Sequence, residues 1–131
     1  MGLPEAIISI VDDDPSFREA TKALLKLLGY ATASFASAED FLKSERLRDS
    51  SCVITDVQMP GMDGMELQRR LIADGHSLPV IFMTAYPEAA AGARVLKQGA
   101  CGYLRKPLDE ERLARCLTKA LNNSEPHPAG I

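Results

Sequence analysis

The sequence predicts an α/β fold: a doubly wound sheet of five parallel strands, built from five strand–helix repeats, (βα)5. First, short apolar segments alternate with longer amphipathic ones five times along the chain. Second, the short segments are apolar at successive positions, which is typical of strands buried on both faces of a parallel sheet. Third, capping residues and glycines mark the ends of the amphipathic segments. This alternation favours right-handed crossovers with helices on both faces of one sheet.

The elements follow in chain order. We expect strands at residues 6–11, 30–35, 52–55, 80–83 and 102–104. Four helices are indicated by apolar residues at helical spacing, namely Phe17, Ala20, Leu24, Leu27 and Leu28; Phe41 and Leu42; Leu67, Leu71 and Ile72; and Leu113, Cys116, Leu117, Ala120 and Leu121. The helix after residue 84 differs, because residues 89–93 are only alanine and glycine. Its main large apolar side chains are therefore Val95 and Leu96.

Local signals place the helix ends. Asp14 is expected to cap the first helix, with Pro15 in the first turn, where a missing N–H costs nothing. Gly29 is suited to end that helix. Ser37 and Asp63 each precede an acidic residue by three positions, the spacing of an N-cap and the third helical residue. Two further glycines, Gly75 and Gly99, follow the third and fourth helices.

Composition limits the class of protein. A chain of 131 residues, 46% hydrophobic and 25% charged, predicts one globular domain. A net charge of −3 excludes a general basic field for nucleic acid, and no apolar run reaches the roughly 18 residues of a membrane span. The first residues lack the basic region of a signal peptide. Three scattered cysteines predict neither a disulfide framework nor a zinc site, but reduced thiols in the cytoplasm.

Chemistry-bearing residues follow four of the predicted strands. Asp12 and Asp13 come after the first strand, Asp56 after the third, Thr84 after the fourth and Lys106 after the fifth. Parallel strands end at the same edge of a sheet, where ligands of such folds bind. Clustered carboxylates repel one another, and an all-oxygen cluster of this kind suits Mg²⁺, with Mn²⁺ as a possible substitute. We therefore expect a metal and phosphate site at this edge.

Four motifs add a family resemblance. They are Ile-Val-Asp-Asp-Asp at 10–14, Thr-Asp-Val-Gln-Met-Pro-Gly-Met-Asp-Gly at 55–64, Met-Thr-Ala at 83–85 and Gly-Tyr-Leu-Arg-Lys-Pro at 102–107. Together they resemble the CheY-like receiver domain of bacterial two-component response regulators, and residues 37–42 resemble the FixJ/NarL-type branch. The resemblance covers residues 5–122 and leaves 123–131 as a linker or disordered C-terminal tail. It implies a flavodoxin-like strand order, 2-1-3-4-5.

The resemblance also implies a role for each matched position. Asp56 corresponds to the phosphoacceptor that takes a phosphoryl group from a sensor histidine kinase. The metal positions are Asp13 as a direct ligand, Asp12 acting through metal-bound water, Asp56 itself and the backbone carbonyl of Gln58. The remaining positions are Lys106, which pairs with Asp56 and then with the acyl phosphate, the switch hydroxyl Thr84 and the switch aromatic Tyr103. In the family the Lys106–Pro107 bond is cis, and Gln58 and Tyr86 occupy positions that tune phosphoryl lifetime.

Several alternatives remain at this stage. A haloacid-dehalogenase-like phosphatase would use Asp12 as nucleophile and Asp14 as acid/base, but it leaves the motif around Asp56 unexplained. A pseudo-receiver scaffold would usually lack an acid, the switch hydroxyl or the lysine, and a flavodoxin would need a phosphate-binding loop where three acids stand.

The receiver reading implies a signalling module that catalyses only its own phosphorylation and dephosphorylation. Its partners would be a kinase and an output domain or downstream protein, with a possible homodimer on phosphorylation through the fourth helix, fifth strand and fifth helix. Direct contact of this chain with nucleic acid or membrane is not expected. A transcriptional output domain absent from this chain and a stand-alone relay or adaptor are both possible.

Overall fold

The sheet has the expected architecture. The computed structural model describes residues 6–124, and its five strands are all parallel in the order β2-β1-β3-β4-β5. The strands are β1 (Ile7–Val11), β2 (Ala31–Phe35), β3 (Cys52–Asp56), β4 (Val80–Thr84) and β5 (Gly102–Arg105). The helices are α1 (Pro15–Leu27), α2 (Ala38–Lys43), α3 (Arg46–Asp49), α4 (Gly64–Ala73), α5 (Ala89–Lys97) and α6 (Glu110–Ser124).

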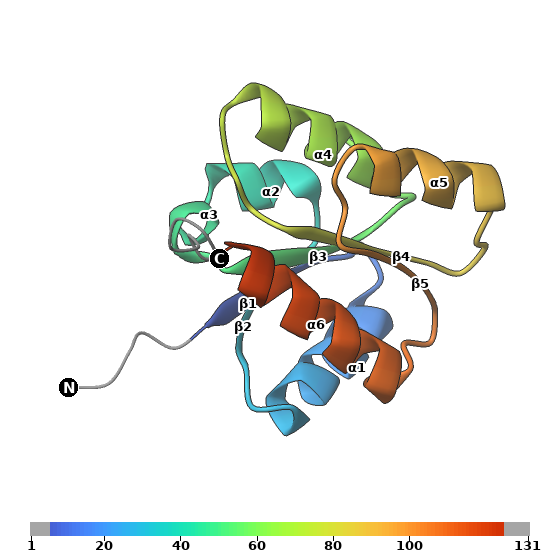
Figure 1. The fold of residues 1–131 in the computed structure, drawn as a ribbon. Helices are drawn as coiled ribbons and strands as arrows, with labels where there is room; N and C mark the ends of the chain where they lie inside the picture. Colours follow the sequence, from blue (N-terminus) through green and yellow to red (C-terminus); the bar gives the residue numbers. More distant parts are fainter. Residues whose placement is uncertain (1–5, 125–131) are drawn as a thin grey trace, which may run out of the picture.

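Helices cover both faces of the sheet (Figure 1): α1 and α6 lie on one face, and α2, α4 and α5 on the other. Side chains of the central strands alternate between these layers, since successive residues of a strand point to opposite faces. Ile54 and Ile81 join the hydrophobic cluster under α1 and α6, whereas Val53 and Phe82 join the other cluster. Every residue of β3 and β4 is buried, so the strand carrying Asp56 has a fixed position.

The predicted helix starts are confirmed in detail. The carboxylate of Asp14 accepts hydrogen bonds from the N–H groups of Ser16 and Phe17 at the start of α1. Asp63 accepts one from Glu66 N at 2.8 Å, and the hydroxyl of Ser37 accepts one from Asp40 N at 3.0 Å. These bonds satisfy N–H groups that have no partner inside the helix.

Some details of the sequence-based prediction are wrong. The one-turn helix α3 was not expected; none of its residues is buried, so it leaves no apolar periodicity in the sequence. In α1 the buried residues are Thr21 and Leu25, whereas Leu27 is 74% exposed. Leu96 is also exposed, so of the two residues named for α5 only Val95 is buried.

The ends of the chain are described only in part. Helix α6 continues through Ser124, two residues into the segment expected to be a tail, and residues 125–131 lie outside the described part of the protein. Among residues 6–124, no helix combines the length and apolar character needed to cross a membrane. The three cysteines are free thiols, and burial raises the pKa of each.

Candidate functional site

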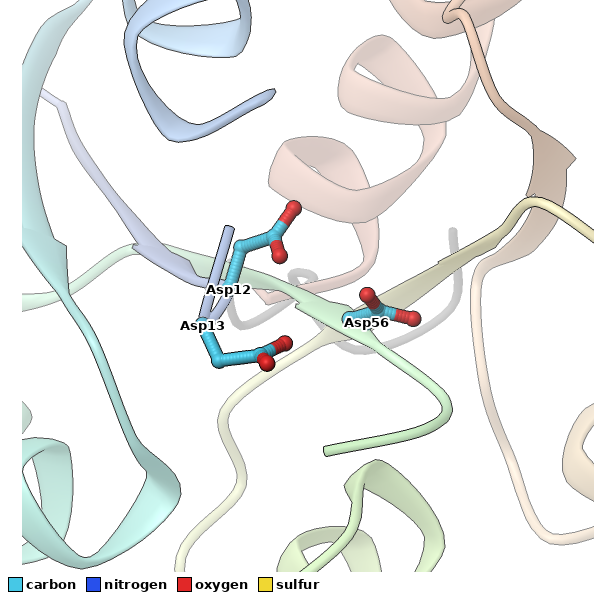
Figure 2. A group of neighbouring side chains, drawn as sticks. All are labelled: Asp12, Asp13 and Asp56. Atoms are coloured by element: carbon cyan, nitrogen blue, oxygen red, sulfur yellow. The ribbon is translucent and has the colours of Figure 1, made fainter. Parts of the chain in front are cut away.

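Three carboxylates meet at the carboxyl edge of the sheet. Asp12 and Asp13 directly follow β1, and Asp56 is the last residue of the neighbouring strand β3. Figure 2 shows the three side chains around the ends of these strands. One oxygen from each lies within 4.8 Å of the others. Asp12 is fully buried and Asp56 is 8% exposed, whereas Asp13 is open to solvent.

The backbone around Asp12 is held by neighbours from other elements. Its N–H donates to the carbonyl of Phe35 at 3.1 Å, which extends the β1–β2 ladder by one residue. Its carbonyl accepts a 2.8 Å hydrogen bond from Nη1 of Arg18 in α1. Its carboxylate accepts from Asp14 N at 3.0 Å. Asp12 is therefore fixed in both its backbone and its side chain.

Asp56 is fixed by the loop that follows it. Its Oδ1 accepts a hydrogen bond from Gln58 N at 3.2 Å. The start of α4 then packs against the end of β3, because a Cβ on Gly64 would overlap the carbonyl oxygen of Asp56. This close approach explains why glycine stands at the end of the 55–64 motif.

Lys106 connects two of the carboxylates. Its Nζ lies 2.8 Å from Oδ2 of Asp12 and 2.8 Å from Oδ2 of Asp56. The ammonium also lies 4.3 Å from the ring centre of Phe17 in α1, a cation–π contact. The peptide bond to Pro107 is cis. The family resemblance implied the contact of Lys106 with Asp56, and the structure adds the contacts with Asp12 and with the ring of Phe17.

The cluster shifts the pKa values of two of its members. Burial raises the pKa of Asp56, and the hydrogen bond and charge of Lys106 oppose that rise without cancelling it. Burial lowers the pKa of Lys106, but the hydrogen bonds and charges of Asp12 and Asp56 together outweigh burial and raise it. Three carboxylates face one ammonium, so the ionised cluster carries excess negative charge.

A divalent cation fits this donor set. Carboxylate and carbonyl oxygens are the ligands that Mg²⁺ accepts, and Mg²⁺ usually takes only one or two protein carboxylates while keeping water. Asp13, exposed beside two buried acids, can supply such a ligand at the surface. The side chain of Gln58 is exposed, and its backbone carbonyl is the ligand that the family resemblance implies for this residue. The excess negative charge is the physical reason for a cation here.

The other predicted residues lie along β4, β5 and the start of α5. Thr84, at the end of β4, is 3% exposed, and its Oγ1 accepts a hydrogen bond from Tyr86 N at 3.1 Å. The hydroxyl of Tyr103 in β5 accepts one from Glu88 N at 3.0 Å, just before α5. Tyr86, two residues after the end of β4, is 76% exposed. Of this set, Thr84 lies at the same sheet edge as Asp56, and Tyr103 lies along the neighbouring strand.

Sequence reasoning missed Phe17 and Arg18 as parts of the site. Both occur in the first turns of α1, where the spacing indicated only an apolar face for Phe17. Asp14, the N-cap, sets the direction in which α1 leaves the site and so places both side chains. Nothing in the spacing of α1 shows that a ring will lie against the lysine that follows β5.

Comparison with known proteins agrees with this geometry. Residues 8–118 match the family model described as response regulator receiver domain. The transcriptional regulatory protein FixJ of Bradyrhizobium diazoefficiens is 33% identical over 119 residues, which are 91% of this chain and 58% of that protein. The transcriptional regulatory protein TdiR of Thauera aromatica is 36% identical over 114 residues, 87% of this chain and 50% of that protein.

Solved structures show the same fold. Full-length FixJ from B. japonicum matches with a TM-score of 0.82 and 32% identity, covering 95% of this chain and 61% of that one. The structure of FixJ-N matches with a TM-score of 0.81 and 26% identity, covering 98% of this chain and 100% of that one. The chain therefore spans between 50% and 58% of the length of these two curated relatives, and the whole of the FixJ-N structure.

Proposed function

This chain belongs to the response regulator receiver domain family, and on that premise we propose that it is the phosphoacceptor module of a two-component phosphorelay. In this proposal Asp56 accepts a phosphoryl group from a sensor histidine kinase in the cytoplasm. The observation that carries it is the position of Asp56. Its carboxylate is nearly buried, lies within the acidic cluster and is held by Lys106 at 2.8 Å.

The chemistry assigned to the site is a single displacement. An oxygen of Asp56 attacks the phosphorus of a phosphohistidine, the new O–P bond forms as the N–P bond breaks, and the electron pair returns to the imidazole. Such transfers depend mainly on alignment and on neutralising charge. Burial of β3 and the hydrogen bond from Gln58 N support alignment of the Asp56 carboxylate. Lys106 supplies a positive charge beside it, which an incoming phosphoryl oxygen can share.

A metal ion completes the charge balance in this proposal. Asp13, Asp56 and the carbonyl of Gln58 would hold Mg²⁺ or Mn²⁺ directly, and Asp12 would hold it through water. When bound, the metal would neutralise charge on the phosphoryl oxygens and so allow one anion to approach another. Lys106 remains paired with Asp12, which keeps the ammonium in place while Asp56 reacts.

In this proposal, phosphorylation changes the conformation of one surface of the domain. New phosphoryl oxygens beside Asp56 would attract the hydroxyl of Thr84, which is held by Tyr86 N in the structure. Movement of Thr84 shifts the segment before α5, to which Tyr103 is tied through Glu88 N. The affected surface is formed by α5, β5 and α6. A bistable loop of this kind converts a local charge change into a binding signal.

We assign the wider role from the relatives. Two of them are transcriptional regulatory proteins about twice as long as the matched region. The surface formed by α5, β5 and α6 is therefore proposed to control a transcriptional output domain that is not part of this sequence, with phosphorylation-driven dimerisation as one means. A stand-alone relay or adaptor is the alternative.

The test uses the purified chain with acetyl phosphate and Mg²⁺. Mass spectrometry should show one added phosphoryl group, sensitive to hydroxylamine as expected for an acyl phosphate, and peptide mapping should place it on Asp56. The Asp56→Asn variant should gain none, and omitting the metal should abolish the gain. Phosphate on Asp12 instead would support the phosphatase alternative and overturn the proposal.

Dimerisation is tested separately. Beryllofluoride, which mimics the phosphoryl group, is added with Mg²⁺ and the mass in solution is measured by light scattering. A dimer that forms only with beryllofluoride supports control through the surface of α5, β5 and α6. A monomer in both states contradicts phosphorylation-driven dimerisation.

A further inference from the structure

A carboxylate outside the acidic cluster holds the loop that follows Asp56. Glu39 lies in the first turn of α2, and its Oε2 accepts a hydrogen bond from Met62 N at 3.1 Å. Hydrogen bonds from its own backbone N–H and from Met62 N lower the pKa of Glu39. The carboxylate is therefore ionised at neutral pH, and the contact with Met62 is a charge-assisted hydrogen bond.

The neighbouring residue is shaped for this contact. Gly61 has a φ of +73°, a conformation that favours glycine. A Cβ added to Gly61 would lie 2.7 Å from Oε2 of Glu39, so the carboxylate occupies the space that a side chain would need. The carboxylate of Glu39 therefore contacts the loop at two residues: it accepts a hydrogen bond from Met62 N, and it packs against the Cα of Gly61.

The hydrogen bond to Glu39 holds the 57–63 loop at Met62, between two sections that are held by other hydrogen bonds. Its first residues are held by Val57 N donating to Met83 O at 3.0 Å and by Gln58 N donating to Asp56. Its end is held by Gly64 N donating to Val57 O at 2.9 Å. Glu39 ties the section between these points to a separate helix. That section follows Gln58, whose carbonyl is the proposed metal ligand.

We propose that Glu39 is a positioning residue for the metal site, acting by holding the 57–63 loop against α2. This inference rests on the proposed function, because the metal and the phosphoryl group bind where that function places them. Glu39 itself contacts neither. Without the carboxylate of Glu39, the loop can sample conformations in which the carbonyl of Gln58 points away from the metal. Metal binding must then also order the loop, and the entropic cost of that ordering lowers the affinity.

The experiment measures Mg²⁺ affinity apart from phosphorylation. Titration of Mg²⁺ into ¹⁵N-labelled protein, followed by amide chemical shifts without a phosphodonor, gives the dissociation constant. Glu39→Ala should weaken binding about fivefold, as expected for partial loss of one charge-assisted hydrogen bond. Glu39→Gln keeps an acceptor oxygen and should recover most of the affinity. Asp40→Ala, which removes a carboxylate from the same turn of α2, should bind like the wild type.

Phosphorylation by acetyl phosphate gives a second readout. Glu39→Ala should need a proportionally higher Mg²⁺ concentration for half-maximal rate, with the rate at saturating Mg²⁺ within about twofold of wild type. Gly61→Ala should also weaken Mg²⁺ binding, because its Cβ displaces Glu39 and because alanine is strained at a φ of +73°. The double variant should be weakened by less than the product of the two single effects, since both disrupt one contact.

The outcomes separate this inference from the proposed function. Wild-type Mg²⁺ affinity in a folded Glu39→Ala protein overturns the inference while leaving phosphorylation of Asp56 intact. Equal loss in Glu39→Gln and Glu39→Ala, or in Asp40→Ala, also overturns it. If the wild type binds no Mg²⁺ and accepts no phosphoryl group, the proposed function fails instead. Hydrogen exchange of the Met62 amide would then still report whether Glu39 holds the loop.

Discussion

The ring of Tyr103 lies directly against the backbone of Gly92, so that β5 contacts α5 at a position without a side chain. A Cβ on Gly92 would lie 2.8 Å from Cδ2 of the ring. The hydroxyl of the same tyrosine accepts a hydrogen bond from Glu88 N, one turn earlier. Tyr103 therefore spans the start of α5, and Gly92 provides the space that the ring occupies.

This contact predicts that Gly92→Ala destabilises the protein despite favouring the helix. Alanine gains about 1 kcal/mol of helix propensity over glycine. The added methyl must displace the ring, and overpacking of this kind costs about 1–3 kcal/mol. We expect a net loss of about 1 kcal/mol in the free energy of unfolding, measured by urea denaturation. In a Tyr103→Ala background the same substitution should stabilise, and a loss of equal size in both backgrounds would contradict the steric explanation.

We expect a substitution of Asp56 in the acidic cluster to stabilise the protein, in contrast to Gly92→Ala. Its pKa is raised even with Lys106 beside it, so the folded protein disfavours the ionised form. Asp56→Asn removes that charge and leaves Lys106 paired with Asp12. We expect the free energy of unfolding to rise at pH 7 in metal-free buffer, because asparagine removes the cost of burying a charge and the repulsion from Asp12. A less stable variant under these conditions would be evidence against net repulsion in the cluster.

The same comparison has a defined pH dependence. A carboxyl whose folded pKa is raised contributes most stability below its ordinary pKa of 3.8 and loses that contribution as pH rises through the folded value. The advantage of Asp56→Asn should therefore be largest near neutral pH and shrink as the pH falls toward 4. Denaturation of both proteins across this range tests the direction. An advantage that grows on acidification would mean that the folded pKa is lowered.

We expect Lys106→Met to lower the free energy of unfolding strongly. The substitution leaves the carboxylates of Asp12 and Asp56 buried without their shared cation, a situation that costs about 3 kcal/mol. Because the folded pKa of Lys106 is raised, its contribution is fully present below the ordinary value of 10.5 and is lost as pH rises through the folded value. The difference in urea midpoint between the two proteins should therefore narrow in strong alkali. Lys119→Met, at an exposed position in α6, is the control and should change little.

The fold could be predicted because its signals are local. Apolar runs such as residues 80–83 are buried strands, and Asp14 and Asp63 cap the helices that follow them. The short helix α3 could not be predicted in this way, because only Leu47 of its four residues is apolar and packs against the core, and one residue leaves no periodic pattern. The inward face of α1 was assigned with the wrong leucine, since Leu24, Leu25, Leu27 and Leu28 fit several helical faces and only packing selects among them.

The sequence was enough to predict which residues lie together at the ends of the strands. Parallel topology brings Asp12, Asp56 and Lys106 to one edge whatever their side-chain conformations. The hydrogen bond between Lys106 and Asp12 joins residues 94 apart in sequence and depends on the direction that each side chain takes. The contacts of Phe17 with Lys106 and of Glu39 with Met62 likewise depend on side-chain conformation. Sequence spacing defines which residues are near, but not which atoms meet.

Tyr86 supplies the last prediction, on the lifetime of the phosphoryl group. Its backbone N–H binds the hydroxyl of Thr84, while its ring stands 76% exposed two residues after the end of β4. A bulky side chain so close to Thr84 can shield an acyl phosphate on Asp56 from water. Tyr86→Ala should therefore lose phosphate faster, by about threefold, equivalent to about 0.7 kcal/mol of barrier. Tyr86→Phe keeps the ring and should match the wild type, and decay in Mg²⁺ at an equal or slower rate in Tyr86→Ala would contradict shielding.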